Sequence, residues 1–211
     1  MSDPARGAAR WWARTVPIPS GLDRFDLAVD DWFDAHLRGH PAIDRLMYAA
    51  SAVGDHGIIW LALAVLQAVR SPHKWQPRLL RATAGLGIES AIVNGPVKWL
   101  FRRTRPVHEG PRPLHLRTPL TSSFPSGHAS SAFFGAAVLS DGDSWWPLYY
   151  ALAIVVASSR IHVKIHHASD VVAGAAFGAV LGEVARRLVP VGPLQRSTNP
   201  KRVESTRRRR R

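Results

Sequence analysis

Three short stretches of the sequence gather the side-chain types that bind and attack phosphate esters. They are KWLFRRTRP (98–106), PSGH (125–128) and SRIHVKIHHASD (159–170). Guanidinium and ammonium groups bind phosphate oxygens, an imidazole can act as a nucleophile or a general acid, and a carboxylate can orient an imidazole. Together the three stretches indicate a reaction at phosphorus.

The histidines and the aspartate are the candidate catalytic residues. His166 and Asp170 stand four residues apart, so on a continuing helix they share a face. The carboxylate of Asp170 can then accept a hydrogen bond from one ring nitrogen of His166 while the other nitrogen attacks phosphorus. His128 can protonate the departing oxygen as a general acid. The expected intermediate is a phosphohistidine, which water hydrolyses.

Five further residues are candidates for holding the phosphate oxygens. Fixed cations come from Lys98, Arg105 and Arg160, and an arginine matches phosphate oxygens in bidentate geometry. Ser126 and Gly127 supply backbone N–H groups at a helix start, where unpaired donors and the macrodipole favour an anion. We expect these five residues to form the substrate-binding part of the site.

The same histidines also allow a metal site. His162, His166 and Asp170 are spaced i, i+4, i+8 and could ligate a metal on one helical face. The cations predicted around them would repel a metal ion and attract an anion. We therefore expect neither a metal nor a cofactor.

Other polar residues near the three stretches have a structural interpretation. We expect satisfied loop or core histidines at His108, His115, His162 and His167. We expect charges that face water or lipid headgroups at Arg102 and Arg103, and a solvated loop charge at Lys164.

Apolar segments separated by polar residues indicate an all-α protein. They cover 57–69, 83–101, 128–140, 145–159 and 170–189, and a weaker segment at 41–54 is a candidate sixth helix. A membrane span needs about 20 apolar residues, and the small residues of AGAAFGAVLG (173–182) allow helices to approach closely in lipid. We expect a membrane-embedded bundle of five to six helices, with a tightly packed soluble bundle as the alternative.

Chain direction predicts where the site lies in this bundle. If successive segments run antiparallel, the end of the second, the start of the third, the end of the fourth and the start of the fifth lie at one end. The candidate residues occupy those four places. We therefore expect the active site at one end of the bundle.

Composition along the chain divides it into three parts. Residues 1–40 form an amino-terminal region in which apolar residues at helical spacing predict an amphipathic helix, either at a membrane interface or capping a soluble bundle. We expect residues 41–189 to form the helical domain that carries the three stretches, the phosphatase domain if the chemistry above is right. Residues 190–211 are a polybasic tail poor in apolar residues, which predicts disorder.

The charge balance indicates an anionic partner. The chain has 28 Lys plus Arg against 15 Asp plus Glu, a net charge of +13, and lacks cysteine. We expect the tail to bind anionic membrane lipids. A tail that binds nucleic acid is not expected, because nothing else in the chain indicates a nucleic-acid partner. Positive charges in the 70–81 connection and the tail predict an integral plasma-membrane protein with a cytoplasmic tail and an outward-facing active site. The oligomeric state stays open.

The three stretches resemble, in order, the signature blocks of the type 2 phosphatidic acid phosphatase superfamily. The resemblance covers 98–170 directly, and the helical organisation extends it to roughly 41–189. It implies His166 as nucleophile, Asp170 as its orienting partner and His128 as acid, without metal. It implies phosphate binding by Lys98, Arg105, Ser126, Gly127 and Arg160. His167 and Ala168 replace an aromatic residue and a proline found in many members, which affects local loop shape.

The resemblance and the residues together predict an enzyme. The expected reaction is hydrolysis of a lipid phosphate or diphosphate, of the phosphatidate or polyprenyl type (undecaprenyl, for example). The superfamily also includes soluble acid phosphatases and vanadate-dependent haloperoxidases, so a soluble non-specific acid phosphatase is one alternative. A non-catalytic, basic membrane protein that only binds lipid phosphates is the other. The sequence does not distinguish a monophosphate from a diphosphate substrate.

Overall fold

The described part of the chain is built of helices. A computed structural model describes residues 20–70, 75–101, 103–108, 112, 114, 116 and 121–191, and these contain no strand. The helices in chain order are α2 (Ser20–His36), α3 (Pro41–Val53), the 3₁₀ turn η1 (Asp55–Gly57), α4 (Ile58–Arg70), α5 (Trp75–Ile92), the π-helical turn η3 (Val93–Val97), the one-turn α6 (Lys98–Leu100), α7 (Gly127–Leu139), α8 (Trp146–His162) and α9 (Ala168–Leu188). The predicted all-α bundle is confirmed.

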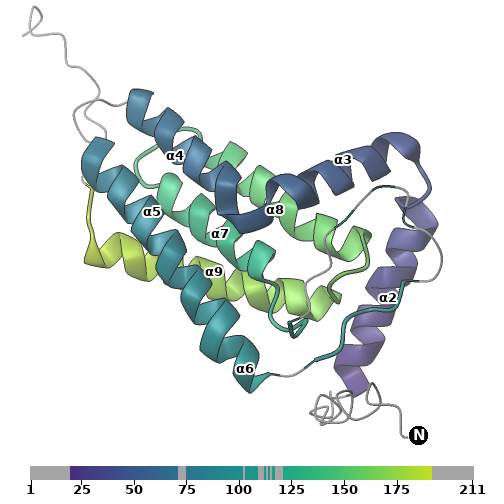
Figure 1. Ribbon diagram of the computed structural model, residues 1–211. Coiled ribbons are helices and arrows are strands. Elements are labelled where there is room, and N and C mark those ends of the chain that lie inside the picture. Colours follow the sequence, from purple (N-terminus) through teal and green to yellow (C-terminus); the bar gives the residue numbers. More distant parts are fainter. Residues whose placement is uncertain are drawn as a thin grey trace, which may run out of the picture.

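Helix α7 lies at the centre of the bundle. It packs against α9, α8 and α5, with α4 nearby (Figure 1). Nearly every side chain of α7 beyond its first turn is buried, as expected of a helix that is apolar all round. Trp60 of α4, Phe134 of α7 and Tyr149 of α8 are the largest apolar side chains in the main core cluster.

A seam of glycines brings α9 into backbone contact with α7. Gly174, Gly178 and Gly182 are spaced four residues apart. A Cβ atom on Gly178 would lie 2.0 Å from the carbonyl oxygen of Ser130, and one on Gly174 would lie 2.3 Å from that of Ser126. The close approach predicted from AGAAFGAVLG is therefore present, and it fixes the start of α9 against the start of α7.

The second apolar segment differs from its expected bounds. The sequence predicted a helix over 83–101, but α5 begins at Trp75 and its α-helical part ends at Ile92. Pro96 has no N–H to donate, and Gly95 adopts φ −93°, ψ −107°, which is not helical. The interruption widens the last turns and places Lys98 at the end of the bundle.

Length and composition alone give limited evidence of membrane spans. Among the described helices, α9 is long and apolar enough to cross a membrane. Helices α3 and α4 taken together are also long and apolar enough, but the chain bends by 76° between them. The surface adds a second signal: Trp75, Trp145 and Trp146 are exposed at one end of the helices, and Trp99 and Phe101 at the other. Exposed aromatic residues at both ends are typical of helices that meet two membrane interfaces.

Helix α2 lies across the end of the bundle that holds the starts of α7 and α9 (Figure 1). Phe33 and the partly buried Val29 pack on the bundle, whereas Phe25 and Trp32 are exposed. An exposed apolar surface of this kind fits the interfacial interpretation of this helix. The three-part division at residues 40 and 190 stays a prediction, because 1–19 and 192–211 lie outside the described residues.

Candidate active site

The predicted site residues converge at one end of the bundle. Nη1 of Arg105 lies 3.2 Å from Nε2 of His166, and the Ser126 N–H donates to the carbonyl of Asp170 at 3.0 Å. Lys98 lies within electrostatic range of Arg105, Arg160 and Asp170. The antiparallel arrangement expected from the sequence therefore brings the four chain segments together.

His166 is buried in the turn between α8 and α9. Its Nδ1 faces Oδ2 of Asp170 at 3.6 Å, so Nε2 is the nitrogen turned toward Arg105. Burial lowers the pKa of His166 to about 3, with Asp170 opposing the shift and Arg160 and Arg105 reinforcing it. The imidazole is therefore neutral near pH 7, as a nucleophile must be.

Asp170 is fixed by donors on both carboxylate oxygens. Oδ2 accepts from the Ser123 hydroxyl at 2.7 Å and from the His167 N–H at 2.9 Å. The second of these bonds is part of a capping box at the start of α9. Oδ1 accepts from Nη1 of Arg103 at 2.6 Å. The residue that orients His166 is thus held in place from three sides.

Arg103 continues this network to helix α2. Its Nη2 donates to Oδ2 of Asp26 at 2.6 Å, and Asp26 also accepts from the N–H and the hydroxyl of Ser169, at 2.7 and 2.8 Å. The expectation that Arg103 faces water or headgroups was wrong, because its side chain is largely buried and pairs with Asp26. This partner stands 77 residues earlier in the chain, so the sequence around Arg103 gave no sign of it. We name the buried series Asp26–Arg103–Asp170 the carboxylate relay.

His128 has a carboxylate partner that the sequence analysis did not identify. Its Nε2 lies 2.9 Å from Oδ1 of Asp55, in the turn η1 before α4. Asp55 supplies the counter-charge that a protonated imidazole needs in a buried position. The helix start that carries His128 and the turn that carries Asp55 meet at the same end of the bundle.

The cations of the site are held by polar groups from neighbouring elements. The Arg160 side chain is almost fully buried, and its Nη1 donates to the hydroxyl of Ser51 in α3. Arg105 donates to the carbonyl of Ile165 at 3.0 Å and to that of Thr121 at 3.1 Å. Their guanidinium groups are therefore fixed before a substrate arrives.

The backbone donors expected from Ser126 and Gly127 are only partly available. The Ser126 N–H is occupied by the Asp170 carbonyl, and its hydroxyl caps the helix by accepting from the Ala129 N–H at 3.4 Å. Ser126 thus joins α7 to α9, and its amide is not a spare donor. Gly127 begins α7 beside Asn94, whose Oδ1 would lie 2.9 Å from a Cβ at that position.

The remaining polar residues have structural partners. Nε2 of His162 lies 2.8 Å from Oδ1 of Asp44, and Lys164 pairs with Asp34 at 2.9 Å instead of facing water alone. Among the described residues, no three His, Asp or Glu side chains are grouped so that they could hold a metal ion. The expectations for Arg102 and His115 fall outside the described residues.

Comparison with known proteins gives the family. The family model for the PAP2 superfamily matches residues 78–191, more than half of the chain. The chain belongs to the PAP2 superfamily. The matched range contains the three predicted signature stretches, so the family resemblance drawn from them is confirmed.

Characterised PAP2 relatives are phosphatases that act on lipids. The chain is 39% identical over 161 residues to decaprenylphosphoryl-5-phosphoribose phosphatase of Mycobacterium tuberculosis (strain ATCC 25618 / H37Rv), covering 76% of this chain and 89% of the relative. It is 28% identical over 158 residues to undecaprenyl-diphosphatase of Sulfolobus acidocaldarius, covering 73% and 74%. The predicted class, a hydrolase of the lipid phosphatase type, is confirmed by these relatives.

Two solved structures share the fold. A transmembrane PAP2 type phosphatidylglycerolphosphate phosphatase from Bacillus subtilis aligns with a TM-score of 0.62 at 21% identity, covering 81% of this chain and 87% of that one. LpxE of Aquifex aeolicus aligns with a TM-score of 0.62 at 22% identity, covering 82% and 99%. These neighbours support the membrane-embedded bundle expected from the sequence.

Proposed function

We propose that this PAP2 protein is a metal-independent phosphatase that hydrolyses a polyprenyl-type lipid phosphate through a phosphohistidine intermediate. The observation that carries the proposal is the arrangement of His166, with Nδ1 facing Asp170 and Nε2 facing Arg105. A phosphate bound by Arg105 would place its phosphorus beside Nε2. The distance to Asp170, 3.6 Å, is long for a hydrogen bond and is expected to shorten when the substrate binds.

The reaction takes two steps in this site. Nε2 of His166 attacks phosphorus, the bond from phosphorus to the leaving oxygen breaks, and His128 gives its proton to that oxygen. Water then attacks phosphorus with His128 as the base, and the phosphorus–nitrogen bond breaks to regenerate His166. Lys98, Arg105 and Arg160 neutralise the charge that develops on the other phosphate oxygens.

The surface beside Lys98 supports a substrate with a lipid tail. Trp99, Leu100 and Phe101 follow Lys98 directly and are all exposed. A lipid chain lying along this apolar surface would place its phosphate next to Lys98. The names of the matched relatives favour a polyprenyl lipid over phosphatidate as the substrate class.

The membrane orientation is part of the proposal. We expect the catalytic end to face outward and the polybasic tail to bind anionic lipids on the cytoplasmic side. The chain lacks cysteine, so single-cysteine variants give an unambiguous test. An impermeant thiol reagent applied to intact cells should label Thr121→Cys, near the site, and should not label Ser205→Cys, in the tail. The reverse pattern would contradict the proposed orientation.

Phosphate release from purified protein in detergent tests the activity. Wild-type protein should release inorganic phosphate from polyprenyl phosphates in the presence of a chelator and should form an acid-labile phosphoenzyme. His166→Ala should abolish both, whereas His40→Ala, which changes an exposed histidine, should abolish neither. Full turnover by His166→Ala would refute the mechanism. Binding without hydrolysis by wild type would favour the non-catalytic alternative, and turnover of water-soluble esters alone would favour the acid phosphatase alternative.

A further inference from the structure

The first turn of α5 carries a buried arginine without a partner in the described part of the chain. The Arg78 side chain is 2% exposed, and its Nε, Nη1 and Nη2 atoms have no hydrogen-bond partner among the described residues. A guanidinium group keeps its charge in proteins, and burying it without acceptors is costly. The acceptors for Arg78 must therefore come from outside the described residues.

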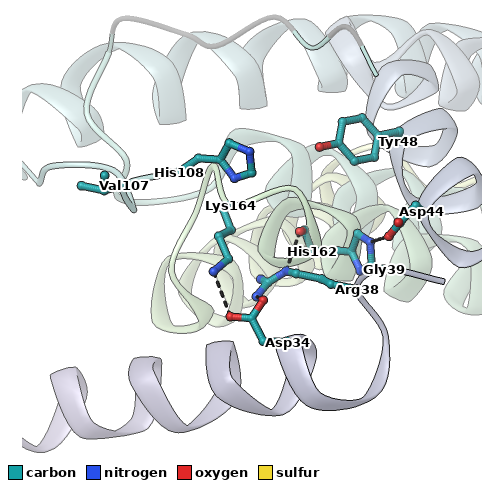
Figure 2. Close-up of a pocket in the computed structure, with 9 residues that line it drawn as sticks. All are labelled: Asp34, Arg38, Gly39, Asp44, Tyr48, Val107, His108, His162 and Lys164. Carbon is teal, nitrogen blue, oxygen red and sulfur yellow. Dashed lines mark hydrogen bonds and ion pairs between the residues drawn. The ribbon is translucent and has the colours of Figure 1, made fainter. Parts of the chain in front are cut away.

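Other largely buried arginines of the protein have the acceptors that Arg78 lacks. Arg38 lines the hollow between α2, α3 and the end of α8, where its Nε donates to the carbonyl of His162 at 2.8 Å (Figure 2). Arg81 lies one turn after Arg78 on the same helix, and its Nη1 donates to Oδ2 of Asp141 at 2.6 Å. The charge of Arg78 is left available to a ligand.

The described carboxylates at this end of the bundle are already paired with other arginines. Each of them lies 2.6–3.5 Å from a guanidinium nitrogen: Asp141 from Arg81, Asp143 from Arg70 and Glu183 from Arg187. None of these carboxylates pairs with Arg78. The charge that remains at this end of the described structure is therefore positive, and it lies on a buried side chain.

The position of Arg78 in α5 favours an anion over a water molecule. Arg78 belongs to the first turn of a helix of 18 residues, and the macrodipole of a helix attracts anions to its start. Long side chains on a helix point back toward the helix start. The guanidinium charge and the dipole therefore act on the same ligand. Because arginine binds phosphate oxygens through two parallel N–H donors, a phosphate group fits this position.

The surroundings of this helix start resemble a membrane surface. The three residues before Arg78 are exposed, and Trp145 and Trp146 are exposed at the same end. Tryptophan side chains collect at the depth of lipid headgroups. From Arg78, α5 continues for about 20 Å along its axis to Ile92. The active site beside Lys98 is therefore at the opposite end of the bundle (Figure 1).

We propose that Arg78 binds the phosphate group of an anionic membrane phospholipid at the end of the bundle opposite the active site. The lipid would approach past the exposed first turn of α5, with its acyl chains beside the exposed Leu80. Basic pockets between membrane helices bind such headgroups in other proteins. The site is separate from the polybasic tail. It does not depend on the catalytic proposal, because Arg78 takes no part in the reaction at His166.

Lipid-dependent thermal stability of the full chain in an uncharged detergent tests the site. Phosphatidylglycerol should raise the unfolding temperature of wild type more than phosphatidylcholine with the same acyl chains. Arg78→Met should need about 10-fold more phosphatidylglycerol for the same rise, because hydrogen bonds to a charged group are lost. Arg78→Lys should keep part of the response, because the charge remains.

A cation at the same end of the bundle provides the matched control. Arg187 is 78% exposed and already pairs with Glu183, so Arg187→Met should respond to both lipids like wild type. Binding of phosphate groups at the active site is common to all these variants and cancels in the comparison. Phosphate release by Arg78→Met should equal that of wild type, so the catalytic proposal and this inference are judged by different measurements.

Several results would contradict the inference. Equal responses to the two lipids in wild type, or equal responses to phosphatidylglycerol in wild type and Arg78→Met, would show that no lipid binds at Arg78. Inorganic phosphate that separates wild type from Arg78→Met at the concentration of the lipid would assign the site to a free anion. Glu204 is the one acidic side chain in residues 192–211. Equal losses of stability in lipid-free Arg78→Met and Glu204→Gln would assign Arg78 to this carboxylate instead.

Discussion

Replacing Arg103 with glutamine tests whether the carboxylate relay supports catalysis. Arg103 donates to Asp170, Asp26 and Ser169 at 2.6, 2.6 and 2.7 Å. Removing one member of a buried ion pair costs about 3–5 kcal/mol. Both carboxylates keep other donors, Ser123 and the His167 N–H for Asp170 and Ser169 for Asp26. We therefore expect the lower end, a loss of about 3 kcal/mol in the free energy of unfolding.

The kinetic effect should appear in kcat. Arg103 acts on His166 only through Asp170. In metal sites, removing the residue that orients a ligand costs about 10- to 100-fold in activity, and we expect a loss of similar size here. That loss corresponds to about 1.4–2.7 kcal/mol in the activation free energy. KM should stay near its wild-type value, because Arg103 donates to protein carboxylates and not to the phosphate oxygens. Arg103→Lys keeps the charge but not the two-pronged geometry, so its kcat should lie between that of wild type and that of Arg103→Gln.

Initial rates and thermal unfolding in detergent measure both effects. Arg45→Gln, which changes an exposed arginine of α3, is the matched control and should behave like wild type. A folded Arg103→Gln protein with wild-type kcat would show that the relay does not act on His166. A rise in KM at constant kcat would show instead that Arg103 binds the substrate.

Three further predictions concern packing and protonation. Gly178→Ala should lower the thermal unfolding temperature sharply because its Cβ would meet Ser130 O at 2.0 Å, whereas Gly87→Ala, with no atom within 4 Å, should not. His166 has a folded-state pKa of about 3, below its unfolded value of 6.5, so stability should fall by about 1.4 kcal/mol per pH unit as the pH drops from 6.5 toward 3. His166→Gln should remove that part of the slope in pH-dependent unfolding curves, and an unchanged slope would contradict the assignment. Asp55→Asn removes the counter-charge of His128, so the alkaline limb of the expected bell-shaped kcat/KM profile should move to lower pH; a profile that keeps its wild-type limbs would exclude this role.

Much of the site could be predicted because its chemistry is local in sequence. His166 and Asp170 lie within one turn of each other, and the antiparallel order of apolar segments brings PSGH to them. The glycines of AGAAFGAVLG also predicted a close contact between two helices. Each of these inferences needs only a short window or the direction of the chain.

The partners that were missed lie far apart in the sequence. Asp26 stands 77 residues from Arg103, and Ser51 stands 109 residues from Arg160. Single polar residues at such separations leave no periodic signal. For Asp26 a local signal was nevertheless present. This residue shares a helical face with Val29 and Phe33, through which α2 packs on the bundle. An acidic residue on the packing face of a helix indicates a buried cationic partner. Asn-Gly-Pro at 94–96 likewise indicated the interruption after α5.

The glycine seam separates the two surfaces of α9. At Gly174 and Gly178 this helix meets main-chain atoms of α7, and its opposite surface exposes Val172, Val180 and Val184. Those outward side chains can be exchanged to suit bilayers of different thickness or lipid composition without displacing Asp170. The surface of α9 that faces the surroundings can therefore change in sequence while the catalytic end of the protein keeps its geometry.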